Sequence, residues 1–174
     1  MFYGTTPTII SQYLYKELRE IQPKRIFIPF AGNFVLEQVA YQACPDADIF
    51  STDVMIYSNA IGFGLTNQDF RLEIRDDYRE DFKYLAGKKK PIEKAAITIF
   101  FTEVSRSLNK QHHQYYVAQY KDAIQNQEQY FKDILRKLES VKENLRFNYF
   151  GYDAMKLISQ VKKGDELRSS CAPD

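Results

Sequence analysis

The sequence lacks the features that mark several classes of protein. Its two cysteines, Cys44 and Cys171, form no CxxC or CxxH spacing, so nothing predicts a zinc site. Lysine plus arginine number 24 against 23 aspartate plus glutamate, and this balance draws the chain neither to nucleic acid nor to a membrane. No apolar run approaches the roughly 18 residues of a membrane span, and no signal-peptide pattern is visible. We expect a cytoplasmic protein with no membrane partner.

Three motifs that contain glycine are also missing. The absence of GxGxxG disfavours a dinucleotide pyrophosphate site, and the absence of GxxxxGK[ST] disfavours a P-loop. No GxSxG elbow surrounds Ser105 or Ser107, so hydrolase chemistry has no support. Any ligand site must therefore rest on a less regular pattern.

What the sequence does contain is a strand, helix and strand in succession. With 44% hydrophobic and 15% aromatic residues, the chain can form one globular domain over residues 1–174. RIFIPF at Arg25–Phe30 predicts a buried strand, FVLEQVAYQAC a helix ended by Pro45, and DADIFSTDV a second strand. Such a βαβ unit forms a parallel sheet, so the predicted fold class is α/β and doubly wound.

The rest of the chain is predicted to be largely helical, as an insertion at about 66–145. The apolar run Ala95–Phe101 fits a strand or a buried helix, because periodicity does not separate the two. The polar segment Gln111–Lys142 predicts one long helix or a helix pair. Just before the insertion, Gly62 and Gly64 are expected to break a short helix.

The loop after the first predicted strand is a candidate ligand site. Ala31 and Gly32 are small, so a ligand can approach the backbone at the start of the following helix. Asp53 stands 21 residues after Gly32, at the end of the second strand, where an acidic side chain can accept hydrogen bonds from a ribose diol. The spacing is equally consistent with a plain turn and with Asp53 as a helix cap.

Three segments in this order resemble the Dam-type DNA adenine methyltransferases, and in particular their divergent phage relatives. They are MFYGTTPTIISQYL, RIFIPFAGNF and DIFSTDVMIYSNAI. The family opens with a Y-x-G-S-K-like cofactor loop and continues to a P-F-x-G-x-G loop and an N-D-x-N-like turn. The later segment FNYFGYDAMKLI is similar, more loosely, to the family's x-D-A strand end. The resemblance implies a methyltransferase-type, Rossmann-like parallel sheet.

The resemblance also implies S-adenosylmethionine as cofactor. Tyr3 and Gly4 would lie over its methionine end, and Phe30, Ala31 and Gly32 would pack against it. The alternatives are that Tyr3 is a core aromatic residue and Gly4 part of a flexible terminus.

Two acidic residues complete the implied cofactor site. Asp53 would take the ribose hydroxyls, and Asp153 would face the adenine amino group. Asp153 equally fits the N-cap of the helix that begins at AMKLISQ, and the two roles are compatible.

The family's catalytic motif, [DN]-P-P-[YF], has no counterpart, because the sequence contains no Pro-Pro pair. Where the family places that strand, after DAMKLISQVKKGD, this chain reads ELRSSCAPD. We therefore expect no catalytic residue, an incomplete sheet and no methyl transfer by this chain alone. Three interpretations stay open: a fragment of a longer methyltransferase, a natural remnant that keeps the binding fold and has lost catalysis, with or without its cofactor, or a superficial likeness. A missing central strand also favours a homodimer that covers the gap.

An alternative function is a phage-encoded inhibitor of a host defence system, of the anti-restriction or anti-CRISPR type, built on the same scaffold and located in the bacterial cytoplasm. Its charged helices would bind a host defence protein. DNA is the other candidate partner, with Lys88, Lys89 and Lys90 as the residues that would contact phosphates. Interleaved acidic residues cancel much of that charge, so a solvated helix face is the competing interpretation.

Overall fold

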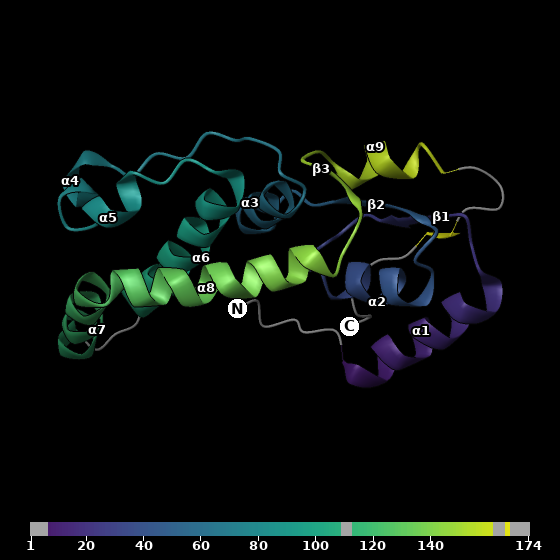
Figure 1. Ribbon diagram of the computed structural model, residues 1–174, viewed down its shortest axis with the longest axis horizontal. Coiled ribbons are helices and arrows are strands. Elements are labelled where there is room, and N and C mark those ends of the chain that lie inside the picture. The colour runs from purple at the N-terminus through teal and green to yellow at the C-terminus, as the bar shows by residue number, and fades with distance from the viewer. Residues whose placement is uncertain (1–6, 109–112, 162–165, 168–174) are drawn as a thin grey trace.

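The computed structural model describes residues 7–108, 113–161 and 166–167, and its centre is a parallel sheet (Figure 1). Within these residues four strands run in the order β3-β2-β1-β4. They span Arg25–Ile28 (β1), Asp48–Thr52 (β2), Asn148–Phe150 (β3) and Glu166–Leu167 (β4). The predicted α/β class is confirmed: the sheet is small and open, helices dominate, and the architecture fits an incomplete Rossmann-like fold.

The predicted βαβ unit is present. Helix α2 (Val35–Ala43) connects β1 to β2, which pair in parallel from Arg25 with Asp48 to Ile28 with Ser51. Pro29 follows β1 directly, in keeping with the rule that proline cannot donate a hydrogen bond within a ladder.

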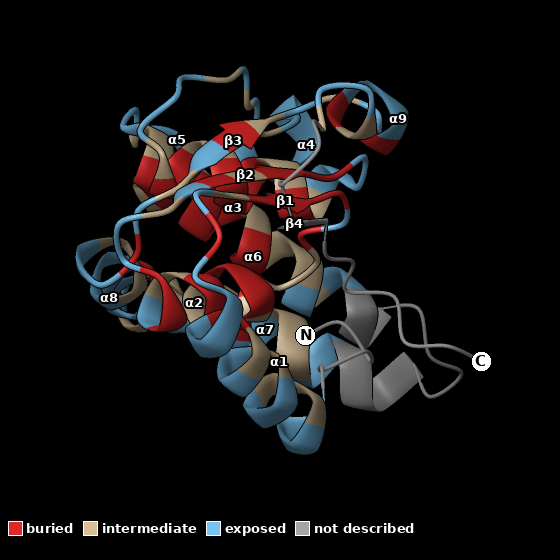
Figure 2. Ribbon diagram, turned by 90° about the vertical axis from the view of Figure 1, so that its right-hand side faces the viewer, coloured by how far each residue is buried: buried red, intermediate tan, exposed pale blue. Residues whose placement is uncertain are grey.

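Helix α1 (Thr8–Ile21) packs on α2, and both lie below the sheet in Figure 1. Between them and the strands lies a cluster of buried side chains: Leu18, Ile26, Ile28, Leu36, Ala40, Ala43, Cys44 and Ile49. Most of α1 outside Leu18 stays exposed or partly exposed (Figure 2).

The segment that replaces the family's catalytic strand does form a strand. Glu166 pairs with Ile26 and Leu167 with Phe27, so β4 lies on the side of β1 away from β2. The position beside β1 is therefore occupied over two residues. Dimerisation to cover such a gap stays a prediction.

Most of the helices lie to one side of the sheet (Figure 1). They are α3 (Ile56–Leu65), α4 (Asp76–Arg79), α5 (Lys83–Ala86), α6 (Pro91–Leu108), α7 (His113–Gln125) and α8 (Gln127–Glu143). The run Ala95–Phe101 is thus part of a helix, and the polar segment after it is a helix pair divided at Asn126. The assignment of 66–145 as an insertion within a single domain stays a prediction.

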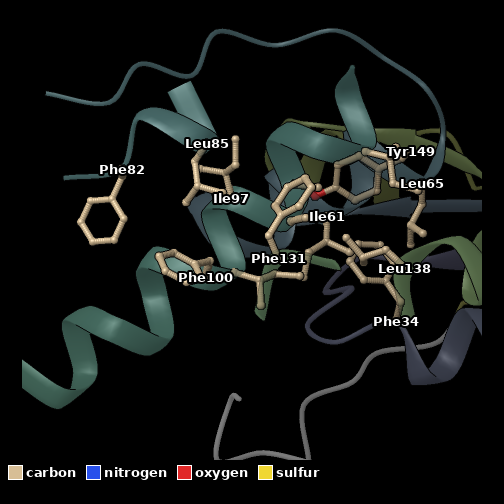
Figure 3. Close-up of a cluster of buried hydrophobic side chains, with 14 of the residues drawn as sticks. Phe34, Ile61, Leu65, Phe82, Leu85, Ile97, Phe100, Phe131, Leu138 and Tyr149 are labelled. Atoms are coloured by element: carbon tan, nitrogen blue, oxygen red, sulfur yellow. The ribbon is translucent and has the colours of Figure 1, made fainter. Parts of the chain in front are cut away.

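One apolar core joins these helices to the sheet (Figure 3). It extends from Phe82 and Phe100 in the helical part to Phe34 and Tyr149 at the strands. The Tyr149 ring lies 5.5 Å edge-on from that of Phe63 on α3 and 5.7 Å from that of Phe34. Tyr149 therefore anchors the helical part to the sheet.

The predicted helix break at Gly62 and Gly64 is wrong, because α3 runs through both residues. A Cβ atom at Gly62 would lie 2.5 Å from the Tyr149 ring, and one at Gly64 would lie 2.6 Å from the Ala95 Cβ on α6. These glycines let α3 approach β3 and α6 closely, which outweighs the roughly 1 kcal/mol that each costs within a helix.

Helix α9 (Ala154–Ile158) lies beside β2 on the sheet face opposite to α2 (Figures 1 and 2). The helix predicted to begin at AMKLISQ is confirmed. None of the helices in the described residues is long and apolar enough to cross a membrane.

Candidate functional site

Three loops meet at the carboxyl edge of the sheet, where ligands bind in open parallel α/β folds. They follow β1 (residues 29–34), β2 (residues 53–55) and β3 (residues 151–153). The first two are joined by backbone, since the Ala31 N–H donates to the Thr52 carbonyl at 3.0 Å. The predicted loop and the predicted acidic residue are therefore neighbours.

Asp53 is the centre of this edge. Its Oδ2 accepts the Gly32 N–H at 2.8 Å, and its Oδ1 accepts the Met55 N–H at 2.8 Å, just before α3. The interpretation of Asp53 as a cap of the turn into α3 is thus supported. Each carboxylate oxygen has a second lone pair, so these bonds do not prevent Asp53 from accepting a ligand's hydroxyl groups.

The backbone of the first loop is unusual at two positions. Gly32 has φ 55° and Phe34, the residue before α2, has φ 63°. A positive φ suits glycine but is rare for a bulky residue. In the P-F-x-G-x-G pattern Phe34 occupies the place of the second glycine. Its buried ring packs against Phe147 at 5.6 Å and Tyr149 at 5.7 Å, so core packing holds this conformation.

A buried hydroxyl group at the end of β2 binds the start of the third loop. Thr52 Oγ1 lies 2.6 Å from the Phe150 carbonyl oxygen and also contacts that of Tyr152, so its proton is shared between two acceptors. Asp153 follows at once, and its Oδ1 accepts the Met155 N–H at 2.6 Å as the N-cap of α9. The cap interpretation of Asp153 is confirmed, while its contact with an adenine stays a prediction.

Thr52→Val should destabilise the fold by about 1–2 kcal/mol, because valine keeps the shape but leaves both loop carbonyls without the hydroxyl. The free energy of unfolding in urea measures this loss. Thr102→Val is the control: its hydroxyl donates to the Thr98 carbonyl within the single helix α6, so its loss should be smaller. Equal losses in the two variants would contradict a fastening role for Thr52.

Sequence reasoning missed a buried carboxyl group below the loops. Glu37, in the first turn of α2, is completely buried, and its Oε1 accepts the Ser51 hydroxyl at 2.5 Å. The pKa of Glu37 is raised from 4.5 to about 8: burial is the main cause and the charge of Asp53 contributes, while the Ser51 bond opposes both. One feature of the sequence could have indicated this buried group: Glu37 directly follows Leu36, which belongs to the apolar stripe of the predicted helix.

Apolar side chains surround the edge. Phe30, Val54, Met55 and Ile56 are between 37% and 83% exposed, although all are large and hydrophobic. They follow directly on β1 and β2, so they flank Asp53. Tyr3 and Gly4, which were assigned to the same site, lie outside the described residues.

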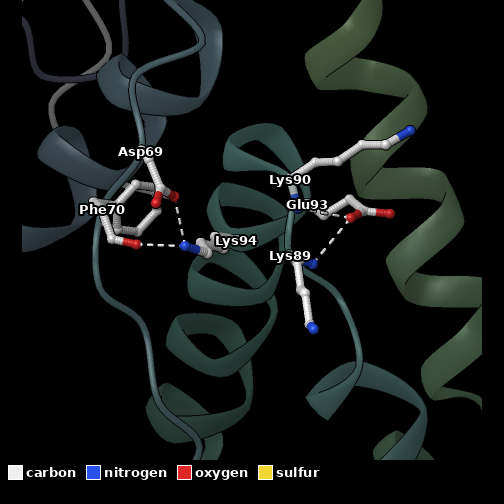
Figure 4. Close-up of polar contacts among 6 residues, drawn as sticks. All are labelled: Asp69, Phe70, Lys89, Lys90, Glu93 and Lys94. Carbon is white, nitrogen blue, oxygen red and sulfur yellow. Dashed lines mark hydrogen bonds and ion pairs between the residues drawn. The ribbon is translucent and has the colours of Figure 1, made fainter.

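The three predicted phosphate-binding lysines make different local contacts in the structure. The Lys88 ammonium lies over the Tyr84 ring, 4.3 Å from its centroid. Lys89 and Lys90 donate their backbone N–H groups to Glu93 Oε2 at 3.2 and 3.0 Å, and their side chains extend in different directions (Figure 4). A role in binding DNA stays a prediction.

The positive charges of the arginines upstream of these lysines are balanced by neighbouring acidic residues. Ion pairs join Arg71 to Glu73, Arg75 to Asp77 and Arg79 to Asp76, all at exposed positions. Such pairs add little stability, but they reduce the positive field that a nucleic-acid surface requires.

The sequence matches the model of one known protein family. The model of the phage DNA adenine methylase-like domain 1 family matches residues 2–173. No curated protein and no solved structure matches the chain. Because the family model spans nearly the whole sequence, the resemblance seen in its first sixty residues extends beyond them. The chain belongs to the phage DNA adenine methylase-like domain 1 family.

Proposed function

We propose that this chain binds S-adenosylmethionine at the carboxyl edge of its sheet, as a methylase-like protein without the family's catalytic motif. The observation that carries the proposal is the 2.8 Å bond between the Gly32 N–H and the Asp53 carboxylate. It holds the acidic group at the loop where a nucleoside would lie. Asp53 is nearly buried, with 5% of its surface exposed, and it lies at the edge where nucleosides bind in such folds.

The residues around Asp53 suit the rest of this cofactor. The exposed side chains of Phe30, Val54 and Ile56 offer apolar surface to a flat adenine ring. Asp153 uses Oδ1 for its helix cap, so Oδ2 can accept from the adenine amino group. Tyr3 and Gly4 belong to the same proposal on the resemblance alone.

Catalysis is the part of the family's function that we do not assign to this chain. Bound S-adenosylmethionine supplies an activated methyl group, but transfer also requires residues that hold a flipped adenine. The sequence has no Pro-Pro pair and hence no [DN]-P-P-[YF] motif. We propose a catalytically incomplete protein, whether a fragment or a remnant. The alternative of a host-defence inhibitor stays a prediction that no feature of the described residues favours.

Calorimetry with S-adenosylmethionine tests the proposal. Wild type should bind, and Asp53→Ala should weaken binding at least tenfold, because it removes the acceptor for the ribose and the tie to Gly32. Asp48→Ala is the matched control: this aspartate is exposed at the opposite end of the same strand and should leave affinity unchanged. Absence of both binding heat and thermal shift for wild type at millimolar ligand would overturn the proposal.

A further inference from the structure

The buried contact between Glu37 and Ser51 lies beneath the candidate cofactor site. Glu37 is the third residue after the loop 29–34, and Ser51 precedes Asp53 by two residues. Their bond therefore joins the start of α2 to the end of β2. Next to it, the Gly32 N–H donates to Asp53 and joins the loop before α2 to the loop after β2. One bond thus connects the two loops of the site, and the other connects the two elements that carry these loops.

We propose that Glu37 is a positioning residue of this site, which in its neutral form holds the end of β2 against α2 and so keeps Asp53 in place for the ligand. This inference rests on the proposed binding of S-adenosylmethionine. Glu37 acts through Ser51 and Asp53 and need not touch the ligand itself.

The environment of Glu37 favours the neutral form. The residue is fully buried, Oε1 bonds to Ser51, and Oε2 has no hydrogen-bond partner among the described residues. An ionised carboxylate with a bare oxygen in such a place is costly, whereas a neutral carboxyl is tolerated. A second negative charge would also repel Asp53, whose charge already raises the Glu37 pKa.

Among the described residues, no cation contributes to the pKa of Glu37. From β3, Tyr149 interacts with both Glu37 and Asp53, and its own pKa is raised mainly by burial and also by these two acids. Helix α3 carries no charged residue. From α1, Arg19 reaches the Ala43 carbonyl at the far end of α2, and from β1, Arg25 lies over the Phe27 and Phe50 rings.

Ligand affinity should therefore fall as Glu37 ionises. If only the neutral form is competent, the apparent Kd is inversely proportional to the fraction of the protein in that form. With a Glu37 pKa of about 8, binding should be about tenfold weaker at pH 9 than at pH 7.

Calorimetric titration with S-adenosylmethionine at pH 7 and pH 9 tests this dependence. Glu37→Gln stays neutral and keeps an oxygen for Ser51, so its affinities at the two pH values should differ by less than twofold. Ser51→Ala removes the bond through which Glu37 acts, so it should weaken binding already at pH 7. The control Glu20→Gln, at an exposed position on α1, should retain the wild-type profile.

A second readout needs no ligand. In NMR spectra of the free protein, the Gly32 and Met55 amides, which bond to Asp53, should shift with a midpoint near pH 8 in wild type and not in Glu37→Gln. If these shifts occur but S-adenosylmethionine binds at neither pH, the positioning role stands and the proposed function fails. If the ligand binds with the same pH dependence in wild type and Glu37→Gln, the positioning role is overturned and the proposed function stands.

Discussion

Glu37→Gln is expected to remove a decline of about 4 kcal/mol in the free energy of unfolding that wild type shows between about pH 4.5 and pH 8. Burial raises the Glu37 pKa in the folded state from 4.5 to about 8, so the folded chain holds a proton that the unfolded chain releases. The contribution to wild-type stability is complete below about pH 4.5. It is lost at about 1.4 kcal/mol per pH unit as the pH rises to 8, and glutamine removes this loss.

Urea unfolding at pH 5, 6.5 and 8 measures this dependence. The decline in wild-type stability with pH should be reduced in Glu37→Gln and unchanged in Glu20→Gln, whose side chain is exposed. Equal slopes in wild type and Glu37→Gln would show that Glu37 does not titrate in this range, and the positioning role would lose its basis.

Gly62→Ala is expected to destabilise the protein by about 2–3 kcal/mol, although alanine is the better helix former. The new Cβ would lie 2.5 Å from three carbon atoms of the Tyr149 ring, which is itself fixed by the surrounding aromatic residues. Either α3 or β3 must move. Because Tyr149 anchors the helical part to the sheet, the movement would loosen the joint between them.

The control for this variant is Gly87→Ala, since a Cβ at Gly87 would meet nothing within 4 Å. Its stability should change by less than about 0.5 kcal/mol. A double-mutant cycle with Tyr149→Leu should recover part of the loss at Gly62, as expected for residues in contact. A Gly62→Ala variant that is more stable than wild type would contradict the close packing of α3 on β3.

The parts of the fold that were predictable depend on local pattern. RIFI and DIFST are short, apolar and rich in β-branched and aromatic residues, and the proline after β1 marks its end, so the βαβ unit follows from the sequence. Gly32 and Asp53 could be paired for the same reason, since parallel strands bring their carboxyl ends to one edge.

The parts that were missed depend on contacts between distant residues. From its neighbours in sequence, Gly62 is expected to break a helix. Its actual role, to make room for the Tyr149 ring, depends on a contact with a residue far along the chain. A glutamate in a predicted helix is ordinarily expected at the surface, and the burial of Glu37 depends on Ser51 and on core residues that lie elsewhere in the sequence. Strand β4 is two residues long, too short for periodicity to reveal, and it exists through its pairing with β1.

An NMR titration of the chain with S-adenosylmethionine tests the central claim most directly. Binding at the carboxyl edge should shift the amide signals of Gly32, Asp53 and Met55, together with those around Asp153, and leave the far ends of α4 and α7 unchanged. Asp53→Ala should abolish these shifts at the same ligand concentration. Shifts confined to the helical part, or none at millimolar ligand, would contradict a cofactor site at this edge of the sheet.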